Sequence, residues 1–536
     1  MTERNSKVLS KSVLSAALNI AASVFIRLFT FVTNAFILRR VTKDVLGIGV
    51  RNILLYETVV FLSREAFRKS CLSKPQDGNW KGTINLVWAS VVIGAVLSTL
   101  LGHVWCNILE LPSTNVDQYL AAVKLMCLSS IVMLLSEPFY TVGQVYLHVK
   151  FRTVADLFFI CFYTAMQSVV AFYWPEKAVI LYAAAHLLDS CIFVLAHVVY
   201  FYLVIRRQNA AKKKDDSLEV IPFESINDFL PSGFNFDKER RLLFWSFFKQ
   251  GFLKQLLTEG EKYMFTWFSL MTIPEQGVYD VIANLGSIPA RMFFSKLEES
   301  AHLYFSQTIK RGELNEKDAA MEKGSTQHLN ILLKALIVIS LVVCTFGMSF
   351  AHMALNIYGG SLLSSGIGPD LLRAHCFLVM FLAINGITEC YAFCAMTQDQ
   401  VSRYNYKMAV MTCLFLGCTY WFVKIIGPVG FIVANCCNFL MRIANNIFLI
   451  NERFNTSSGI GHPLNEIWPS KTSILVLLIS GGACHFSEIY LYGPNFKRQI
   501  LHLLVGAAAF LVSMIILCVK ESWLKSLVVK LKEKVL

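Results

Sequence analysis

The sequence predicts an all-α membrane protein that crosses the bilayer many times, and its composition is the first reason. Of 536 residues, 55% are hydrophobic and only 16% are charged, and the mean hydropathy is +0.53. A soluble chain carries about 25% charged residues. This composition argues against soluble enzymes, nucleic-acid-binding proteins and disordered scaffolds. The surplus apolar side chains are expected to face lipid.

The second reason is a series of apolar runs, each near the length of about 20 residues that a membrane-spanning helix needs. We expect the first run to remain in the protein as a span, because it is longer than the apolar region of a signal peptide. Fourteen spans are predicted: Val13–Leu38, Val45–Arg64, Thr83–Cys106, Tyr119–His148, Val154–Trp174, Ala178–Ile205, Leu242–Met271, Gly277–Ser306, His328–Met353, Leu371–Met396, Met408–Val423, Gly427–Ile450, Thr472–Tyr492 and Ile500–Val519.

The third reason is the distribution of basic residues between these runs. With a cytoplasmic N-terminus, 30 of the 49 Lys and Arg residues lie in inside segments and 7 in outside segments. Cytoplasmic loops carry such an excess of positive charge. The sequence therefore predicts that both termini are cytoplasmic.

Polar and charged side chains form a stripe on one face of five predicted spans. They lie within about 80° of arc on the first span, 40° on the second and 60° on the eighth, at 3.6 residues per turn. The stripes consist of Asn19, Ser23, Arg27, Thr30 and Asn34; Glu57, Arg64 and Arg68; Gln250, Lys254, Thr258 and Glu261; Asp280, Asn284, Arg291, Ser295, Glu298 and His302; and Asn435, Asn438, Arg442, Asn445 and Asn446. Charged groups at bilayer depth usually face a bundle interior or a water-filled cavity.

The charge-rich first and second spans have counterparts six helices later, in the seventh and eighth spans. This spacing predicts two pseudo-symmetric six-helix bundles plus two C-terminal helices around a central cavity. The predicted parts are an N-terminal bundle (1–205), a basic cytoplasmic linker (206–241), a C-terminal bundle (242–450), two additional spans (451–519) and a basic amphipathic tail (520–536).

The cavity is expected to be positively charged and to bind an anion. Its candidate binding residues are Arg27, Arg51, Arg64, Arg68, Lys254, Arg291 and Arg442, with Asn34, Glu57, Glu65, Glu261, Asp280, Asn284 and Glu298 as polar or charge partners. Guanidinium groups suit phosphate oxygens, so a pyrophosphate joined to a lipid tail is the favoured ligand. Arg64, Arg68 and Arg291 are expected to share this cavity. The alternative is that the charges form buried ion pairs, such as Glu57–Arg64 and Lys254–Glu261, that fix helix register.

Enzyme and cofactor motifs are absent from the sequence. There is no GxxxxGK[ST], DxD, HExxH or GxSxG pattern, and no Cys/His spacing that suits zinc. The fifteen cysteines lie mostly within apolar runs and are expected to pack as small hydrophobic side chains. We therefore expect a protein that is not an enzyme and needs neither a metal nor a cofactor.

Six stretches, together about a fifth of the chain, form a recognisable set. They are RLFTFVTNAFILR (27–39), ILLYETVVFLSREAFRKSC (53–71), FFKQGFLKQLLTEGEKY (247–263), EQGVYDVIANLGSIPARMFFSKLEES (275–300), LAINGITECYAF (382–393) and GPVGFIVANCCNFLMRI (427–443). In these stretches the sequence resembles the eukaryotic dolichol-linked oligosaccharide translocation protein family, within the multidrug/oligosaccharidyl-lipid/polysaccharide exporter superfamily.

The resemblance implies a protein of the endoplasmic reticulum membrane that serves N-glycosylation. It implies movement of the Man5GlcNAc2 oligosaccharide on dolichol pyrophosphate from the cytosolic to the luminal leaflet. The expected partners are this lipid-linked oligosaccharide, membrane lipids and the N-glycosylation machinery, with no nucleic acid. Two alternatives remain open at this point: a non-transporting accessory or scaffold protein of the same pathway, and a cation-coupled small-molecule exporter. The absence of an acid from the first predicted span counts against the exporter.

Overall fold

The computed structural model describes residues 25–71, 80–146, 148–211, 221–233, 238–309, 311, 316–455, 467–493 and 495–521. These residues form helices and connecting turns, with no strand among them. Two compact units divide the chain between Gly277 and Val278. The basic linker is described only in part, and the tail after Glu521 lies outside the described residues, as do Asn19 and Ser23 of the first predicted stripe.

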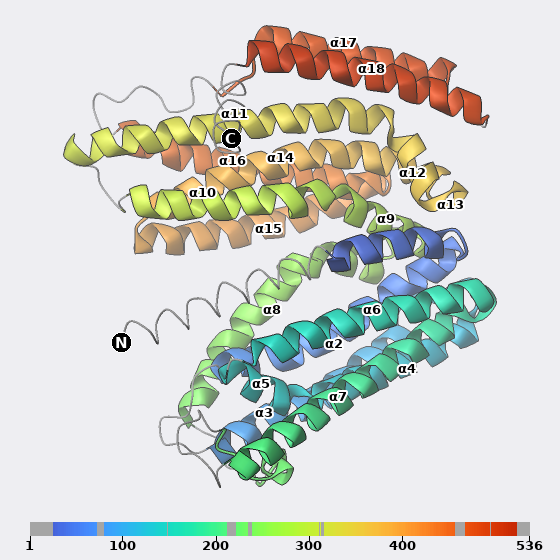
Figure 1. The fold of residues 1–536 in the computed structure, drawn as a ribbon, viewed down its shortest axis with the longest axis vertical. Helices are drawn as coiled ribbons and strands as arrows, with labels where there is room; N and C mark the ends of the chain where they lie inside the picture. The colour runs from blue at the N-terminus through green and yellow to red at the C-terminus, as the bar shows by residue number, and fades with distance from the viewer. Residues whose placement is uncertain are drawn as a thin grey trace. The chain divides into compact units, whose positions relative to one another are not determined.

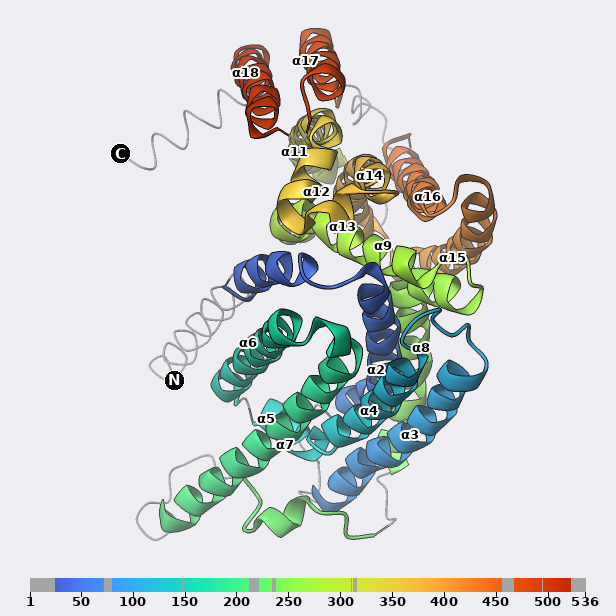
Figure 2. The same cartoon turned by 90° about the vertical axis from the view of Figure 1, so that its right-hand side faces the viewer.

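The first unit contains a helix over Phe25–Leu38 and seven further α-helices after it. They are α2 (Lys43–Ser70), α3 (Trp80–Asn107), α4 (Val116–Leu134), α5 (Glu137–Val145), α6 (Val149–Tyr173), α7 (Ala178–Ala211) and α8 (Lys238–Trp267). Figure 2 shows α4 and α7 running alongside each other, and the two helices pack closely. The seventh predicted span, α8, packs against α2 and so belongs to this unit.

The second unit is built around α14, which packs against α10, α11 and α16. The short helix α9 (Ile273–Gly286) crosses the boundary between the two units. The helices that follow it are α10 (Ser295–Thr308), α11 (Glu316–Ser349), α12 (Ala351–Gly359), α13 (Ser361–Ser364), α14 (Gly368–Ala395), α15 (Gln398–Ile426), α16 (Val429–Asn455), α17 (Lys471–Tyr490) and α18 (Phe496–Lys520). In Figure 1 the last two helices form a pair beside α11, as their packing requires.

Eleven of the described helical segments are long and apolar enough to cross a membrane. The prediction of an all-α polytopic membrane protein is therefore confirmed, while the number fourteen stays a prediction. The remaining three predicted spans correspond to Phe25–Leu38, to the charge-rich α8, and to the region of α9 and α10.

Proline interrupts two of the predicted spans. The fourth span breaks at Leu135–Ser136, and Pro138 lies in the first turn of α5. In the eighth span, α9 ends at Gly286. Pro289 then precedes a π-helical turn, Ala290–Phe294, which leads into α10. Proline has no backbone N–H and clashes with the preceding turn, so a helix cannot run through it undisturbed.

Candidate functional site

A bidentate ion pair joins the last turn of α2 to the first turn of α5 in the first unit. Arg68 donates from Nε to one carboxylate oxygen of Glu137 and from a terminal nitrogen to the other, both at 2.6 Å. The Glu137 side chain is only 1% exposed. The Arg68 guanidinium also lies 3.5 Å from the centre of the Tyr140 ring. This fork geometry is the strong form of a charged hydrogen bond.

Arg64 lies one turn earlier on α2 and approaches the same carboxylate. Its guanidinium is 3.9 Å from Glu137, and its side chain is 28% exposed. Two arginines thus surround one carboxylate, and the cluster Arg64–Arg68–Glu137 has a formal charge of +1. Arg64 is the more loosely held of the two cations.

Lys254 of α8 is a further cation that contacts α2, through Glu65. Its ammonium group is 3.9 Å from Glu65, which also binds Lys69 at 3.2 Å. The Lys254 side chain is 61% exposed. Glu57 of α2 is exposed, and Glu261 of α8 is half-buried. The structure thus places several members of the second and seventh predicted stripes along the packed pair α2 and α8.

Arg51 lies in a different environment from the one the sequence predicted. Arg51 is completely buried. Its guanidinium donates hydrogen bonds to the Gln276 side chain at 2.9 Å and to the Glu110 backbone carbonyl at 2.6 Å. The Trp105 indole donates to its backbone carbonyl at 3.1 Å. One terminal nitrogen of Arg51 has no hydrogen-bond partner among the described residues, and its role in binding stays a prediction.

A second ion pair lies in the second unit, between α14 and α16. One terminal nitrogen of Arg442 donates to both oxygens of Glu389 at 3.0 Å, and each side chain is 21% exposed. The Asn385 amide nitrogen donates to the same carboxylate at 2.8 Å. Asn446, from the predicted stripe on α16, is buried nearby and bonds Thr388 and Tyr404.

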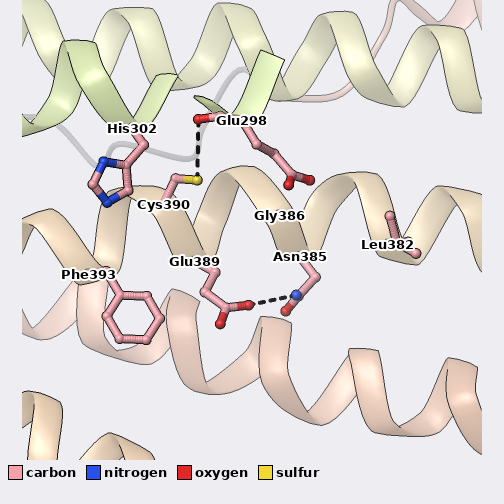
Figure 3. Close-up of a pocket in the computed structure, with 8 residues that line it drawn as sticks. All are labelled: Glu298, His302, Leu382, Asn385, Gly386, Glu389, Cys390 and Phe393. Carbon is pink, nitrogen blue, oxygen red and sulfur yellow. Dashed lines mark hydrogen bonds between the residues drawn. The ribbon is translucent and has the colours of Figure 1, made fainter. Parts of the chain in front are cut away.

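A cavity of about 390 Å³ adjoins this pair. Figure 3 shows α10 contributing Glu298 and His302 from one side and α14 contributing the other lining residues. The lining consists of Glu298, His302, Leu382, Asn385, Gly386, Glu389, Cys390 and Phe393. Glu298 was predicted from the sequence as a charge partner, and its carboxylate lies directly over Gly386.

The remaining predicted residues fall in three places. Arg27 and Asn34 are exposed on the helix Phe25–Leu38. Asp280 accepts a hydrogen bond from Asn284 at 3.0 Å on α9. The Arg291 side chain is outside the described residues, so a cavity shared by Arg64, Arg68 and Arg291 stays a prediction.

The sequence interpretation missed two acidic residues that form the centres of the ion pairs, Glu137 and Glu389. Both lie in apolar runs that were assigned as spans. A carboxylate inside such a run is a signal in itself, because an unpaired charge at that depth is costly. Glu137 carries a second signal, since Pro138 follows it and marks a helix start.

The fold is that of the multidrug/oligosaccharidyl-lipid/polysaccharide exporters. The structure resembles the lipid II flippase MurJ in an inward closed conformation, with a TM-score of 0.61, 11% identity and coverage of 94% of this chain and 99% of that one. It also resembles an inward-facing multidrug resistance MATE family transporter, with a TM-score of 0.56, 12% identity and coverage of 83% and 100%.

Sequence comparison identifies the family within this fold. The model of the Rft protein family matches residues 11–531. The Man(5)GlcNAc(2)-PP-dolichol translocation protein RFT1 of Xenopus tropicalis is 37% identical, over 95% of this chain and 94% of its own length. The proteins of the same name from Mus musculus and Saccharomyces cerevisiae are 38% and 27% identical, over 93% and 82% of this chain and the same shares of their own lengths. The chain belongs to the Rft protein family, as the sequence resemblance indicated.

Proposed function

We propose that this protein is a flippase that moves a dolichol-pyrophosphate-linked oligosaccharide, Man5GlcNAc2-PP-dolichol, across the endoplasmic reticulum membrane for N-glycosylation. Movement runs from the cytosolic to the luminal leaflet. Two observations support this proposal. The relatives in sequence are named as translocation proteins, and the fold is similar to those of a lipid II flippase and a multidrug resistance transporter. The protein acts without catalysis, by offering a charged path to a head group that the bilayer interior excludes.

The observation that carries the proposal is the excess positive charge around Glu137. One carboxylate cannot neutralise both Arg64 and Arg68, and Lys254 adds a further exposed cation on α8. A pyrophosphate provides several anionic oxygens that accept from guanidinium groups. Arg64 is the cation we assign to the first contact with the pyrophosphate, because its distance to Glu137 is long and its side chain is the more exposed.

A reconstituted assay tests this function directly. The purified protein is placed in liposomes with a short-chain Man5GlcNAc2 pyrophosphate lipid, and the loss of substrate accessible at the starting face is followed with time. Accelerated loss that falls when Arg64 becomes Gln supports the proposal. A wild-type rate no greater than that of empty liposomes contradicts it and favours an accessory role. Glu176→Gln, in an exposed turn of the same unit, is the control.

Arg27 allows a test in cells. Arg27 is exposed on the helix Phe25–Leu38, and we propose that it meets the pyrophosphate during translocation. Lysine keeps the charge but loses the two-pronged guanidinium, so Arg27→Lys is expected to lower glycosylation at a normal protein level. Full glycosylation with Arg27→Ala would remove this residue from the mechanism. A degraded protein would instead indicate that Arg27 neutralises a buried acid.

A further inference from the structure

We infer that the cavity between α10 and α14 is a saccharide subsite, which binds a sugar ring of the substrate through its hydroxyl groups. This inference rests on the proposed function, because it assigns a separate place to the uncharged part of the same ligand. The cavity lies within the second unit and is formed by Glu298, Asn385, Glu389 and Phe393, among others. Figure 3 shows Glu298 on the α10 side of the α14 ribbon, with Asn385, Glu389 and Phe393 extending from the other side of α14.

The first argument is unused hydrogen-bonding capacity. Among the residues that the structure describes, the buried Asn385 side-chain oxygen has no hydrogen-bond partner, although the residue is only 5% exposed. The structure also gives the Glu298 carboxylate no partner within the described part of the chain. The Glu298 carboxylate lines the cavity and can therefore accept hydrogen bonds from a ligand that supplies donors. Sugar hydroxyl groups are such donors.

The second argument is shape. Gly386 forms part of the wall, and a Cβ atom at this position would lie 1.8 Å from a Glu298 carboxylate oxygen. Glycine therefore makes the room in which Glu298 can lie against α14. Phe393 supplies an aromatic surface at the other end of the cavity, suited to the C–H face of a sugar ring (Figure 3).

Charge and volume distinguish a sugar from other ligands. Glu298 and Glu389 together with Arg442 have a formal charge of −1, so the cavity repels a pyrophosphate. A metal cation holds its oxygen ligands at about 2.0–2.6 Å and leaves little space around it. The cavity of about 390 Å³ is instead in the range of about 300–1,000 Å³ that is typical of sites for small organic molecules.

The test separates the two parts of the substrate. Full-length protein in nanodiscs is titrated with the free oligosaccharide Man5GlcNAc2, which has no lipid or phosphate, and separately with a short-chain dolichyl pyrophosphate, which has no sugar. Binding of the oligosaccharide is followed by saturation-transfer NMR. The test variants are Glu298→Gln and Gly386→Ala. The matched controls are Glu299→Gln, whose side chain is 69% exposed, and Gly417→Ala, where a Cβ atom meets nothing within 4 Å.

We expect the oligosaccharide to bind about tenfold more weakly to both test variants, since each loses or displaces a charged hydrogen bond. The controls should stay within about twofold of the wild type, well below the effect of one lost hydrogen bond. Binding of dolichyl pyrophosphate should be unchanged in all four variants, which also shows that they fold. Dolichyl pyrophosphate binding without oligosaccharide binding to the wild type would overturn the subsite and leave the proposed function standing. Equal oligosaccharide binding in every variant would also overturn it. Failure of both probes with the wild type would contradict both proposals.

Discussion

The two ion pairs, Arg68–Glu137 in the first unit and Arg442–Glu389 in the second, have the same chemistry but different surroundings. In the first, a two-pronged guanidinium encloses a carboxylate that is 1% exposed. In the second, a single nitrogen contacts both oxygens of a carboxylate that is 21% exposed and borders a cavity. The first cluster has a surplus cation, and the second has a surplus carboxylate.

This difference corresponds to the two unlike parts of the ligand that we propose. A cationic cluster suits phosphate oxygens, whereas a carboxylate and an amide oxygen suit hydroxyl donors. It also separates structural from binding roles. A closed pair such as Arg68–Glu137 resists exchange of partners, and an open pair beside a cavity can accept a ligand without first being broken.

The largest expected effect is that of Glu137→Gln. Removal of this charge leaves Arg64 and Arg68 close together without the one carboxylate that contacts both, so stability should fall by about 3–5 kcal/mol. Thermal unfolding in detergent measures the change. Glu176→Gln, in an exposed turn, should leave the melting temperature unchanged. If the Glu137→Gln protein is as stable as the wild type, the Arg68–Glu137 pair does not contribute more to stability than the Arg442–Glu389 pair.

A second comparison replaces the arginines with lysine. Arg68→Lys loses one of two short hydrogen bonds and part of the contact with Tyr140, so we expect a loss of about 1.5–3 kcal/mol. Arg442→Lys should cost less, because one nitrogen already makes both contacts with Glu389. Melting temperatures of the two variants provide the measurement. An equal loss would contradict the distinction between a fork and a single-nitrogen contact.

The general fold could be predicted from the sequence because hydropathy and charge placement act locally. Apolar length identified most spans, and the described helices bear this out. Helical periodicity likewise placed Lys254 on a polar stripe, and the structure brings it within 3.9 Å of Glu65, a predicted charge partner.

The pairing of charges could not be predicted in the same way. Arg64 and Glu137 are 73 residues apart, and their approach depends on the break between α4 and α5. The burial of Arg51 depends on Gln276, more than two hundred residues away. Periodicity gives the face on which a side chain lies, but it does not give the helix that covers that face.

The third prediction concerns Glu389→Gln. Glutamine keeps an acceptor for Arg442, and the pair is partly exposed, so stability should fall by only about 1–2 kcal/mol. The same measurement of thermal unfolding applies. A loss as large as that of Glu137→Gln would indicate that the second pair is as closed as the first, and the contrast between the units would disappear.

The smallest expected change in stability is that of Lys254→Gln, although its effect on binding should be clear. The lysine is 61% exposed and 3.9 Å from Glu65, and exposed pairs of this kind contribute about 0–1 kcal/mol. Its charge, however, adds to the field that attracts a pyrophosphate, and its partner Glu65 also has Lys69 at 3.2 Å. Glu65 therefore stays paired when Lys254 is lost. We expect an unchanged melting temperature together with weaker binding of dolichyl pyrophosphate, most evident at low salt because ions screen exposed charges. Lys296→Gln, which removes another exposed lysine with an acidic neighbour, is the control for a general effect of net charge. Unchanged binding with Lys254→Gln would restrict the anion site to the cations around Glu137.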